Sequence, residues 1–140
     1  MAEHDLTALV GGVVLDGTAA PAQRGIAVLV RGTRIEALLP EARIPPGATR
    51  IDLGGMTLLP GLIDTHVHLL GQRSMDNASM TFVGEGLRAA RASADLGRLL
   101  QAGITTVRDC GSYTALALKA AVVEGTIPGP RVVPCGRFIE

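Results

Sequence analysis

Two histidines and an aspartate recur at alternate positions within residues 58–70. Successive side chains of a β-strand point to opposite faces, so Asp64, His66 and His68 would share one face. The residues between them are mostly apolar or β-branched and would pack against a covering layer such as helices. Neutral imidazole is a common metal ligand, and two imidazoles at positions i and i+2 of a strand can approach one ion. The pattern therefore predicts a metal site on one face of a strand.

The histidine pair also has a simpler interpretation, because a histidine is more often a hydrogen-bonded core or surface residue than a ligand. The surrounding sequence favours the ligand interpretation. Pro60-Gly61 is a turn signal immediately before the apolar run, and Gly71 ends that run just after the second histidine. The pair would therefore lie near the C-terminal end of a strand, where the active sites of (β/α)-type barrels and open α/β sheets are found.

The segment from Pro60 to His68 reads Pro-Gly-Leu-Ile-Asp-Thr-His-Val-His. It resembles the first barrel strand of the metal-dependent amidohydrolase superfamily, which ends in His-x-His within a Pro-Gly-x-Ile-Asp-x-His-x-His pattern. Residues 102–109 and 125–131 resemble the imidazolonepropionase and Xaa-Pro dipeptidase-like branch of that superfamily. The resemblance covers nearly the whole chain, and it is to the N-terminal portion only of such a protein.

The resemblance implies an enzyme, a metal-dependent amidohydrolase or dipeptidase-like hydrolase. Its substrates would be small molecules with a C–N bond in an amide, cyclic amide or dipeptide, and its nucleophile would be metal-activated water. The implied cofactor is Zn²⁺, as one or two divalent ions, with other divalent metals compatible. His66 and His68 would bind the metal. Asp64 lies about 6.5 Å further down the strand, so we expect it to orient an imidazole rather than bind the ion directly.

The length of the chain conflicts with a complete barrel. A TIM (β/α)8-type barrel needs about 200 residues or more, whereas residues 60–140 can hold only two βα units and a third strand. The further ligands of the superfamily are a lysine, two histidines and an aspartate that acts as general base, and all come from later strands. We therefore expect no complete catalytic set here. A truncated product, one piece of a split chain and an excised fragment remain open as explanations.

Two functions are compatible with an incomplete barrel. In the first, the chain is part of the hydrolase, is inactive alone, and needs the rest of the barrel or self-association. In the second, it is a truncated, catalytically inactive amidohydrolase-like fragment that acts as a structural or assembly partner. A strand-terminal Lys, His, His and Asp in a continuation of the chain would favour the first.

Composition excludes several other classes of function. Lys and Arg together number 13, as do Asp and Glu, so no net charge attracts nucleic acid or an anionic membrane. The N-terminus lacks a basic region followed by an apolar core, and no apolar run approaches the ~20 residues that span a bilayer. We therefore expect a cytoplasmic location. Cys110 and Cys135 form no spaced metal motif, and we expect both to be small buried hydrophobic residues, with a reactive thiol as the alternative.

Residues 1–58 are expected to form a small β-sandwich-like flanking domain with antiparallel strands. Short β-branched runs separated by Gly and Pro predict the strands, which are residues 9–15, 26–30, 34–38 and 49–53. Arg31-Gly32-Thr33 is well placed to join two of them as a hairpin. In the resembling family such a domain is composite, because strands from the far C-terminus complete it.

Residues 59–140 are expected to begin an α/β barrel with the order βαβαβ and parallel strands. Residues 71–80 have the composition of a surface loop. An apolar stripe through Ala92 and Leu96 predicts a helix over residues 84–102, and residues 104–108 and 131–135 are predicted as strands. Ser112 is a plausible N-cap for a second helix, with a stripe of Tyr113, Leu116, Ala120 and Val123.

Three charged residues lie close to the predicted strand ends. Asp109 ends the second barrel strand, where we favour hydrogen bonds to the adjacent loop over a role at the metal. Arg108 and Arg137 have the side chain that binds a carboxylate in a bidentate manner, but a structural or solvated role is the simpler expectation for both.

Overall fold

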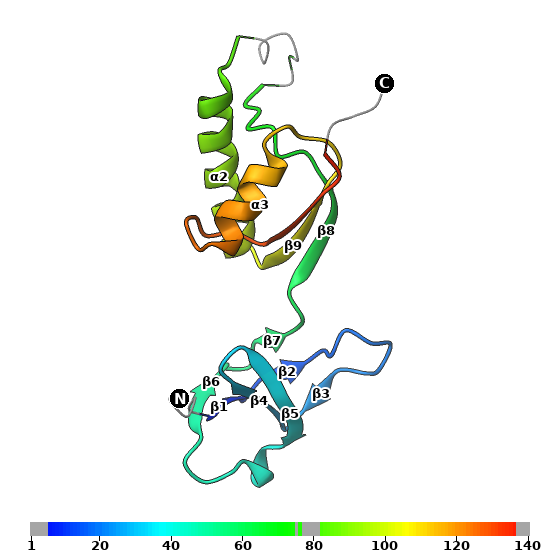
Figure 1. Ribbon diagram of the computed structural model, residues 1–140. Helices are drawn as coiled ribbons and strands as arrows, with labels where there is room; N and C mark the ends of the chain where they lie inside the picture. Colours follow the sequence, from blue (N-terminus) through cyan, green and yellow to red (C-terminus); the bar gives the residue numbers. More distant parts are fainter. Residues whose placement is uncertain (1–5, 75, 77–81, 137–140) are drawn as a thin grey trace. The chain divides into compact units, whose positions relative to one another are not determined.

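The computed structural model describes residues 6–74, 76 and 82–136. The chain forms two compact units, one ending at Pro60 and the other beginning at Gly61 (Figure 1). The predicted boundary, between residues 58 and 59, falls two residues earlier. No helix among the described residues combines the length and the apolar character that crossing a membrane requires.

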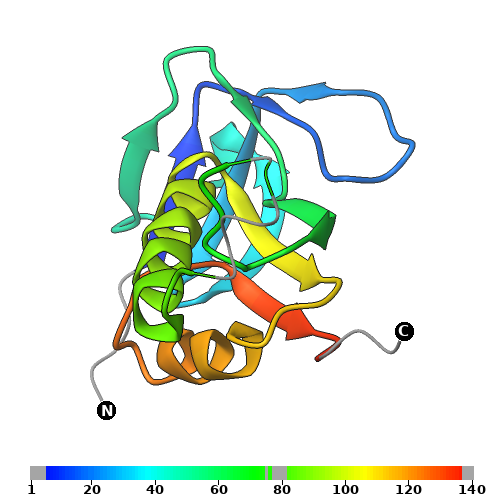
Figure 2. The same ribbon diagram turned by 90° about the horizontal axis from the view of Figure 1, so that it is seen from above.

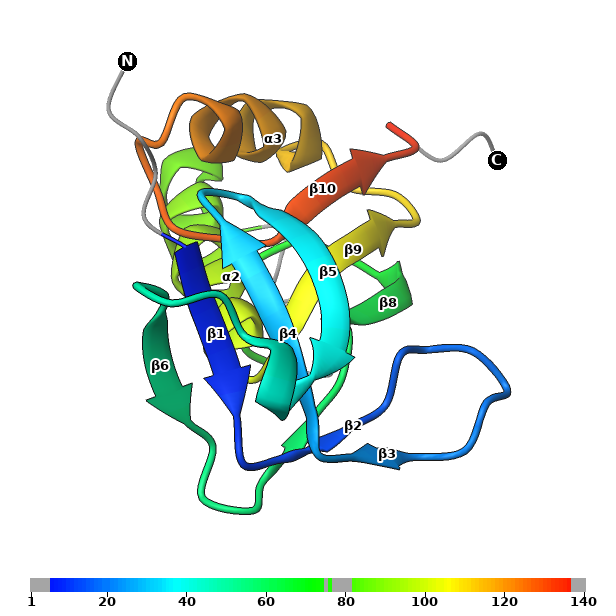
Figure 3. The same cartoon turned by 90° about the horizontal axis from the view of Figure 1, so that it is seen from below.

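The first unit contains two small sheets and one short 3₁₀ helix, η1 (Glu41–Arg43). Four strands form one sheet in the order β5-β4-β1-β6 (Figure 3): β1 (Leu6–Val10), β4 (Ile26–Arg31), β5 (Arg34–Pro40) and β6 (Thr49–Asp52). Three short strands form the other in the order β3-β2-β7: β2 (Val13–Val14), β3 (Gln23–Arg24) and β7 (Thr57–Leu58). Strand β4 carries three of the five buried apolar residues described in this unit, Ala27, Val28 and Leu29.

The predicted hairpin is present, since β4 and β5 pair in antiparallel register around Gly32. The expectation of an antiparallel unit is wrong in two places, because β1 pairs with β6, and β2 with β7, in parallel. Alternation of apolar residues reveals which faces of a strand are buried, but it carries no information on the direction of the neighbouring strand.

Residues 9–15 do not form the single predicted strand. Strand β1 ends at Val10 and β2 begins at Val13, and the two belong to different sheets. Gly11 has a φ of 69°, a backbone conformation that glycine adopts without strain. The Gly11-Gly12 pair therefore turns the chain from one sheet to the other.

The second unit has the predicted order βαβαβ. Its elements are β8 (Leu62–Val67), α2 (Glu85–Gln101), β9 (Ile104–Asp109), α3 (Ala115–Val123) and β10 (Arg131–Pro134). The strands pair in parallel in the order β10-β9-β8. Both helices lie on the same side of the sheet (Figure 2). Residues 71–74 form neither helix nor strand, while other parts of the predicted 71–80 loop lie outside the described residues.

The core of the second unit lies between this sheet and the two helices. Its buried members are apolar residues from all five elements or their ends: Leu69, Ala92, Leu96, Val107, Ala115, Leu118 and Val132. Helix α2 buries Ala92 and Leu96, as the stripe predicts, and Gly103 with a φ of 85° follows its last turn.

The prediction for helix α3 is wrong in its face and in its cap. The helix buries Ala115 and Leu118, whereas Tyr113, Leu116 and Val123 of the predicted stripe are exposed. Ser112 lies before the N-cap residue Thr114 and donates its hydroxyl hydrogen to Asp109 instead of capping the helix. Apolar residues occupy nearly every position of α3, so periodicity could not reveal which side faces the core.

Candidate functional site

Strand β8 carries the histidine pair, but it is not a regular period-two strand. Asp64 pairs with Val107 and Val67 pairs with Asp109, so three steps along β8 match two along β9. Such an irregularity is typical of a β-bulge, a feature often found next to active sites. Val67 and Leu69 face the helices as predicted, whereas Ile63 is 65% exposed. The expectation that this face packs against a covering layer is therefore wrong for the first half of the strand.

The two histidine side chains lie next to each other at the end of β8. Their ring centres are 5.3 Å apart, with the planes inclined by 69° in an edge-to-face arrangement. Both residues are exposed. The carboxylate of Asp64 accepts a hydrogen bond of 3.0 Å from the backbone N–H of His66. This contact is with the backbone of the histidine and not with its ring, so Asp64 stabilises the path of the strand.

The ring of His68 contacts the loop that follows β9. Its Nδ1 atom lies 3.3 Å from the carbonyl oxygen of Gly111. A carbonyl oxygen can only accept a hydrogen bond, so Nδ1 must carry the hydrogen in this contact. In the neutral ring the lone pair is then on Nε2.

Asp109 is fully buried at the end of β9 and accepts three hydrogen bonds. Its Oδ1 accepts from the backbone N–H of Leu69 at 2.9 Å and from the hydroxyl of Ser112, and its Oδ2 accepts from the backbone N–H of Gly111 at 3.2 Å. The expectation that Asp109 bonds to the adjacent loop is confirmed. The bond to Leu69, which joins this loop to the loop after β8, was not foreseen.

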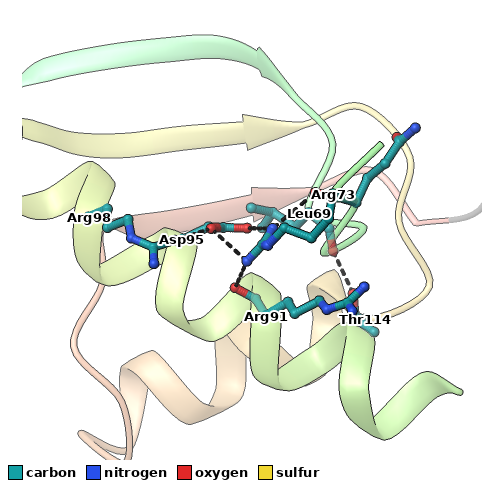
Figure 4. A network of polar contacts seen from close by, with 7 residues as sticks. Leu69, Arg73, Arg91, Asp95, Arg98 and Thr114 are labelled. Atoms are coloured by element: carbon teal, nitrogen blue, oxygen red, sulfur yellow. Dashed lines mark hydrogen bonds and ion pairs between the residues drawn. The ribbon is translucent and has the colours of Figure 1, made fainter. Parts of the chain in front are cut away.

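A network of polar contacts fastens the loop after β8 to helix α2 and to the start of α3 (Figure 4). The guanidinium of Arg73 donates to both carboxylate oxygens of Asp95, at 2.8 and 3.0 Å, and to the backbone carbonyl of Arg91 at 3.1 Å. Thr114 donates its hydroxyl hydrogen to the carbonyl of Leu69 at 2.7 Å. Sequence reasoning missed this network because no fixed spacing links a loop arginine to a carboxylate on the following helix.

Gly71 allows the same loop to approach α2 closely. It is buried, has a φ of 62°, and any Cβ at this position would collide with the backbone carbonyl of Arg88. The sequence marked Gly71 as the end of the apolar run. That pattern did not show that the close contact between the loop and α2 requires a glycine at this position.

A model of the Amidohydrolase family matches residues 57–140, which is more than half of the chain. The chain belongs to the amidohydrolase family. This confirms the resemblance inferred from the histidine motif and the two later segments. The match covers the whole second unit, including the histidine pair, Asp109 and Gly71.

Individual comparisons match an imidazolonepropionase, a Xaa-Pro dipeptidase and a prolidase. The chain is 32% identical over 141 residues to an imidazolonepropionase of Salinispora arenicola, an alignment that covers 80% of this chain and 36% of the relative. Among solved structures, a Xaa-Pro dipeptidase with bound methionine has a TM-score of 0.84 and 30% identity, covering 96% of this chain and 34% of that one. A prolidase complexed with N-methylphosphonate-L-proline has a TM-score of 0.81 and 35% identity, covering 94% of this chain and 32% of that one. The chain thus spans about a third of the length of these relatives.

The amidohydrolase chain brings together fewer candidate ligands than a complete metal site needs. Within residues 6–74, 76 and 82–136, no three His, Cys, Asp or Glu side chains lie close enough to hold an ion. Cys110 is half-buried and Cys135 is exposed, so the expectation of two buried cysteines is wrong. Arg108 is exposed, and Arg137 lies outside the described residues.

Proposed function

We propose that the chain supplies two metal ligands, His66 and His68, to a metal-dependent hydrolase that cleaves C–N bonds in small amides, cyclic amides or dipeptides. The observation that carries this proposal is the pair of adjacent imidazoles at the end of β8, with ring centres 5.3 Å apart. Family membership and the imidazolonepropionase and dipeptidase relatives support the class of reaction.

The separation of the two rings supports a shared metal ion. Two imidazoles that bind one zinc ion at about 2.0–2.1 Å, with a roughly tetrahedral angle between them, have ring centres about 5 Å apart. The separation of 5.3 Å agrees with this requirement. The exposure of both histidines leaves room for further ligands. A catalytic zinc site usually has three protein ligands and one open position, so at least one more must come from outside the described residues.

The residues of this chain would hold and orient the ion. A bound Zn²⁺ or similar divalent ion lowers the pKa of its water and polarises the carbonyl of the substrate. His66 and His68 would provide neutral nitrogen ligands, and Asp64 would hold the backbone of His66 in place. The Gly111 carbonyl would keep the His68 ring in one orientation.

We further propose that the site is completed by the rest of a barrel, from a longer chain, a second chain or a second copy. The sheet β10-β9-β8 has two outer strands, and apolar residues on it are exposed, among them Leu62 (51%), Ile63 (65%) and Val133 (47%). Each aliphatic side chain gains roughly 1.5–3 kcal/mol on full burial. The 140-residue chain alone should therefore self-associate or aggregate, and sedimentation would reveal a monodisperse monomer if this is wrong.

The second candidate function is that of a catalytically inactive fragment that acts as a structural or assembly partner. Its support is that the described residues hold no group of three candidate ligands. The two functions differ in metal dependence. Assembly by such a fragment would be unaffected by removing the metal or by changing His66 and His68 to alanine.

Metal analysis after dialysis tests the proposed function. The complete protein, with the rest of the barrel present, should retain zinc, and His66→Ala or His68→Ala should abolish retention while leaving the far-ultraviolet circular dichroism spectrum unchanged. His4→Ala, which changes the one histidine outside the motif, is the matched control and should retain zinc. Equal metal content in the wild type and the double variant would contradict the assignment.

A further inference from the structure

Asp109 and Ser112 are the only buried polar side chains among the described residues, and Asp109 is the only charged one. A buried carboxylate is costly unless its oxygens accept hydrogen bonds, so its partners are strongly specified. Its partners here come from two different loops, the one after β8 and the one after β9. Neither loop contributes another buried charge within the described part of the chain.

We propose that Asp109 is a positioning residue for His68, which fixes the Nδ1–H tautomer of that ring and so makes Nε2 the metal-binding nitrogen. The part of this inference that concerns the metal-binding nitrogen rests on the proposed function. The tautomer itself is a property of the metal-free protein and can be measured without any metal.

The first step of the argument is that one carboxylate holds both partners of the ring contact. Oδ1 of Asp109 accepts the N–H of Leu69, the residue that directly follows His68. Oδ2 accepts the N–H of Gly111, the residue whose carbonyl faces Nδ1 of His68. Asp109 therefore sets the distance between the histidine backbone and the carbonyl that receives its ring hydrogen.

The second step is that two further contacts join the same two loops but do not involve Gly111, so the position of its carbonyl still depends on Asp109. The N–H of Cys110 donates to the carbonyl of Val67 at 2.8 Å, and Thr114 donates to the carbonyl of Leu69. The residues before and after His68 are thus both bonded to the loop after β9. Partners that fix the tautomer of a metal-binding histidine typically change metal affinity 10–100-fold when removed.

Asp109→Asn is the variant that perturbs this arrangement with the smallest change in shape. The amide has one acceptor oxygen and one N–H₂ donor. With the oxygen at the Oδ1 position, its N–H₂ group faces the N–H of Gly111, and in the flipped orientation it faces the N–H of Leu69. Either orientation removes at least one of the two backbone contacts. Ser112→Ala instead removes only the hydroxyl donor and leaves both backbone contacts in place.

Two-bond ¹H–¹⁵N correlation spectra of the metal-free protein report the tautomer directly. We expect the wild type and Ser112→Ala to show His68 with hydrogen on Nδ1, and Asp109→Asn to show a mixture or the Nε2–H form. Asp52→Asn is the matched control, because Asp52 also accepts an N–H two residues ahead, from Gly54, but lies in the first unit. An Nε2–H tautomer in the wild type would overturn the inference even if Asp109→Asn failed to fold.

Competition with a chromophoric chelator then measures the zinc dissociation constant of the complete protein. We expect Asp109→Asn to weaken zinc binding about 10–100-fold, with Ser112→Ala and Asp52→Asn within about threefold of the wild type. Equal weakening by Asp109→Asn and Ser112→Ala would overturn the positioning role and indicate general destabilisation. A wild type that binds no zinc but keeps the Asp109-dependent Nδ1–H tautomer would contradict the proposed function and uphold the tautomer assignment.

Discussion

The two ends of the sheet in the second unit are built differently. At the C-terminal ends of β8 and β9, Leu69, Asp109 and Ser112 are buried and joined by hydrogen bonds between loops. At the start of β8, Leu62 and Ile63 are largely exposed. The residues around the histidine pair are therefore ordered by contacts within this chain. The opposite end leaves apolar side chains exposed.

Truncating a side chain in the core on the helix-covered side of the sheet should give the largest loss of stability. Leu96 of α2 is fully buried in the core beneath β9, and Leu96→Ala should reduce the free energy of unfolding by about 2–5 kcal/mol. Ile63→Ala is the matched control, because Ile63 is 65% exposed and should cost well under 1 kcal/mol in the isolated chain. Denaturant titration measures both values. If the rest of a barrel packs on the exposed surface that includes Ile63, the cost of Ile63→Ala should rise in the complete protein.

A pair of glycine substitutions compares the two ends of β8 directly. Gly71→Ala should destabilise by about 2–4 kcal/mol, because it combines a positive φ of 62° with a collision against the Arg88 backbone. A Cβ at Gly61 would collide with the side chain of Thr105, including its Cβ atom, but Gly61 has no positive φ and Thr105 is exposed. We expect a smaller cost of roughly 1–2 kcal/mol there. Thermal unfolding that ranks Gly61→Ala above Gly71→Ala would contradict the difference between the two ends.

The smallest effect is expected from the surface ion pair that holds the loop after β8. The side chains of Arg73 and Asp95 are 40% and 33% exposed, so solvent screens their attraction. A double-mutant cycle of Arg73→Ala and Asp95→Ala should give a coupling of about 0.2–1 kcal/mol that falls as salt is added. A coupling that is independent of salt would show that the packing of the loop, and not the ion pair, holds it on α2.

The sequence predicted the structure correctly where the residues are compatible with few local structures. The apolar run that carries His66 and His68, the β-branched run of β9 and the glycine after α2 predicted two strands and a helix end that are present. Prediction failed where several arrangements satisfy the same pattern. Helix α3 is apolar on all sides, and its buried face follows from packing against β10, which no local pattern encodes.

The surroundings of the candidate site were harder to predict than the histidines themselves. Asp109 and Leu69 are 40 positions apart, and their hydrogen bond exists only because β8 and β9 are neighbours in the sheet. Gly71 and Arg73 depend in the same way on where α2 packs. Such contacts follow from tertiary structure and leave no periodic signal in the sequence.

Anomalous diffraction at the zinc absorption edge, from crystals of the zinc-loaded protein, tests the central claim most directly. We predict one peak about 2.0–2.1 Å from a ring nitrogen of His66 and from Nε2 of His68. The same peak should be absent from crystals of the His66→Ala, His68→Ala double variant. A zinc peak bound by other residues, or a peak adjacent to Nδ1 of His68, would contradict the account.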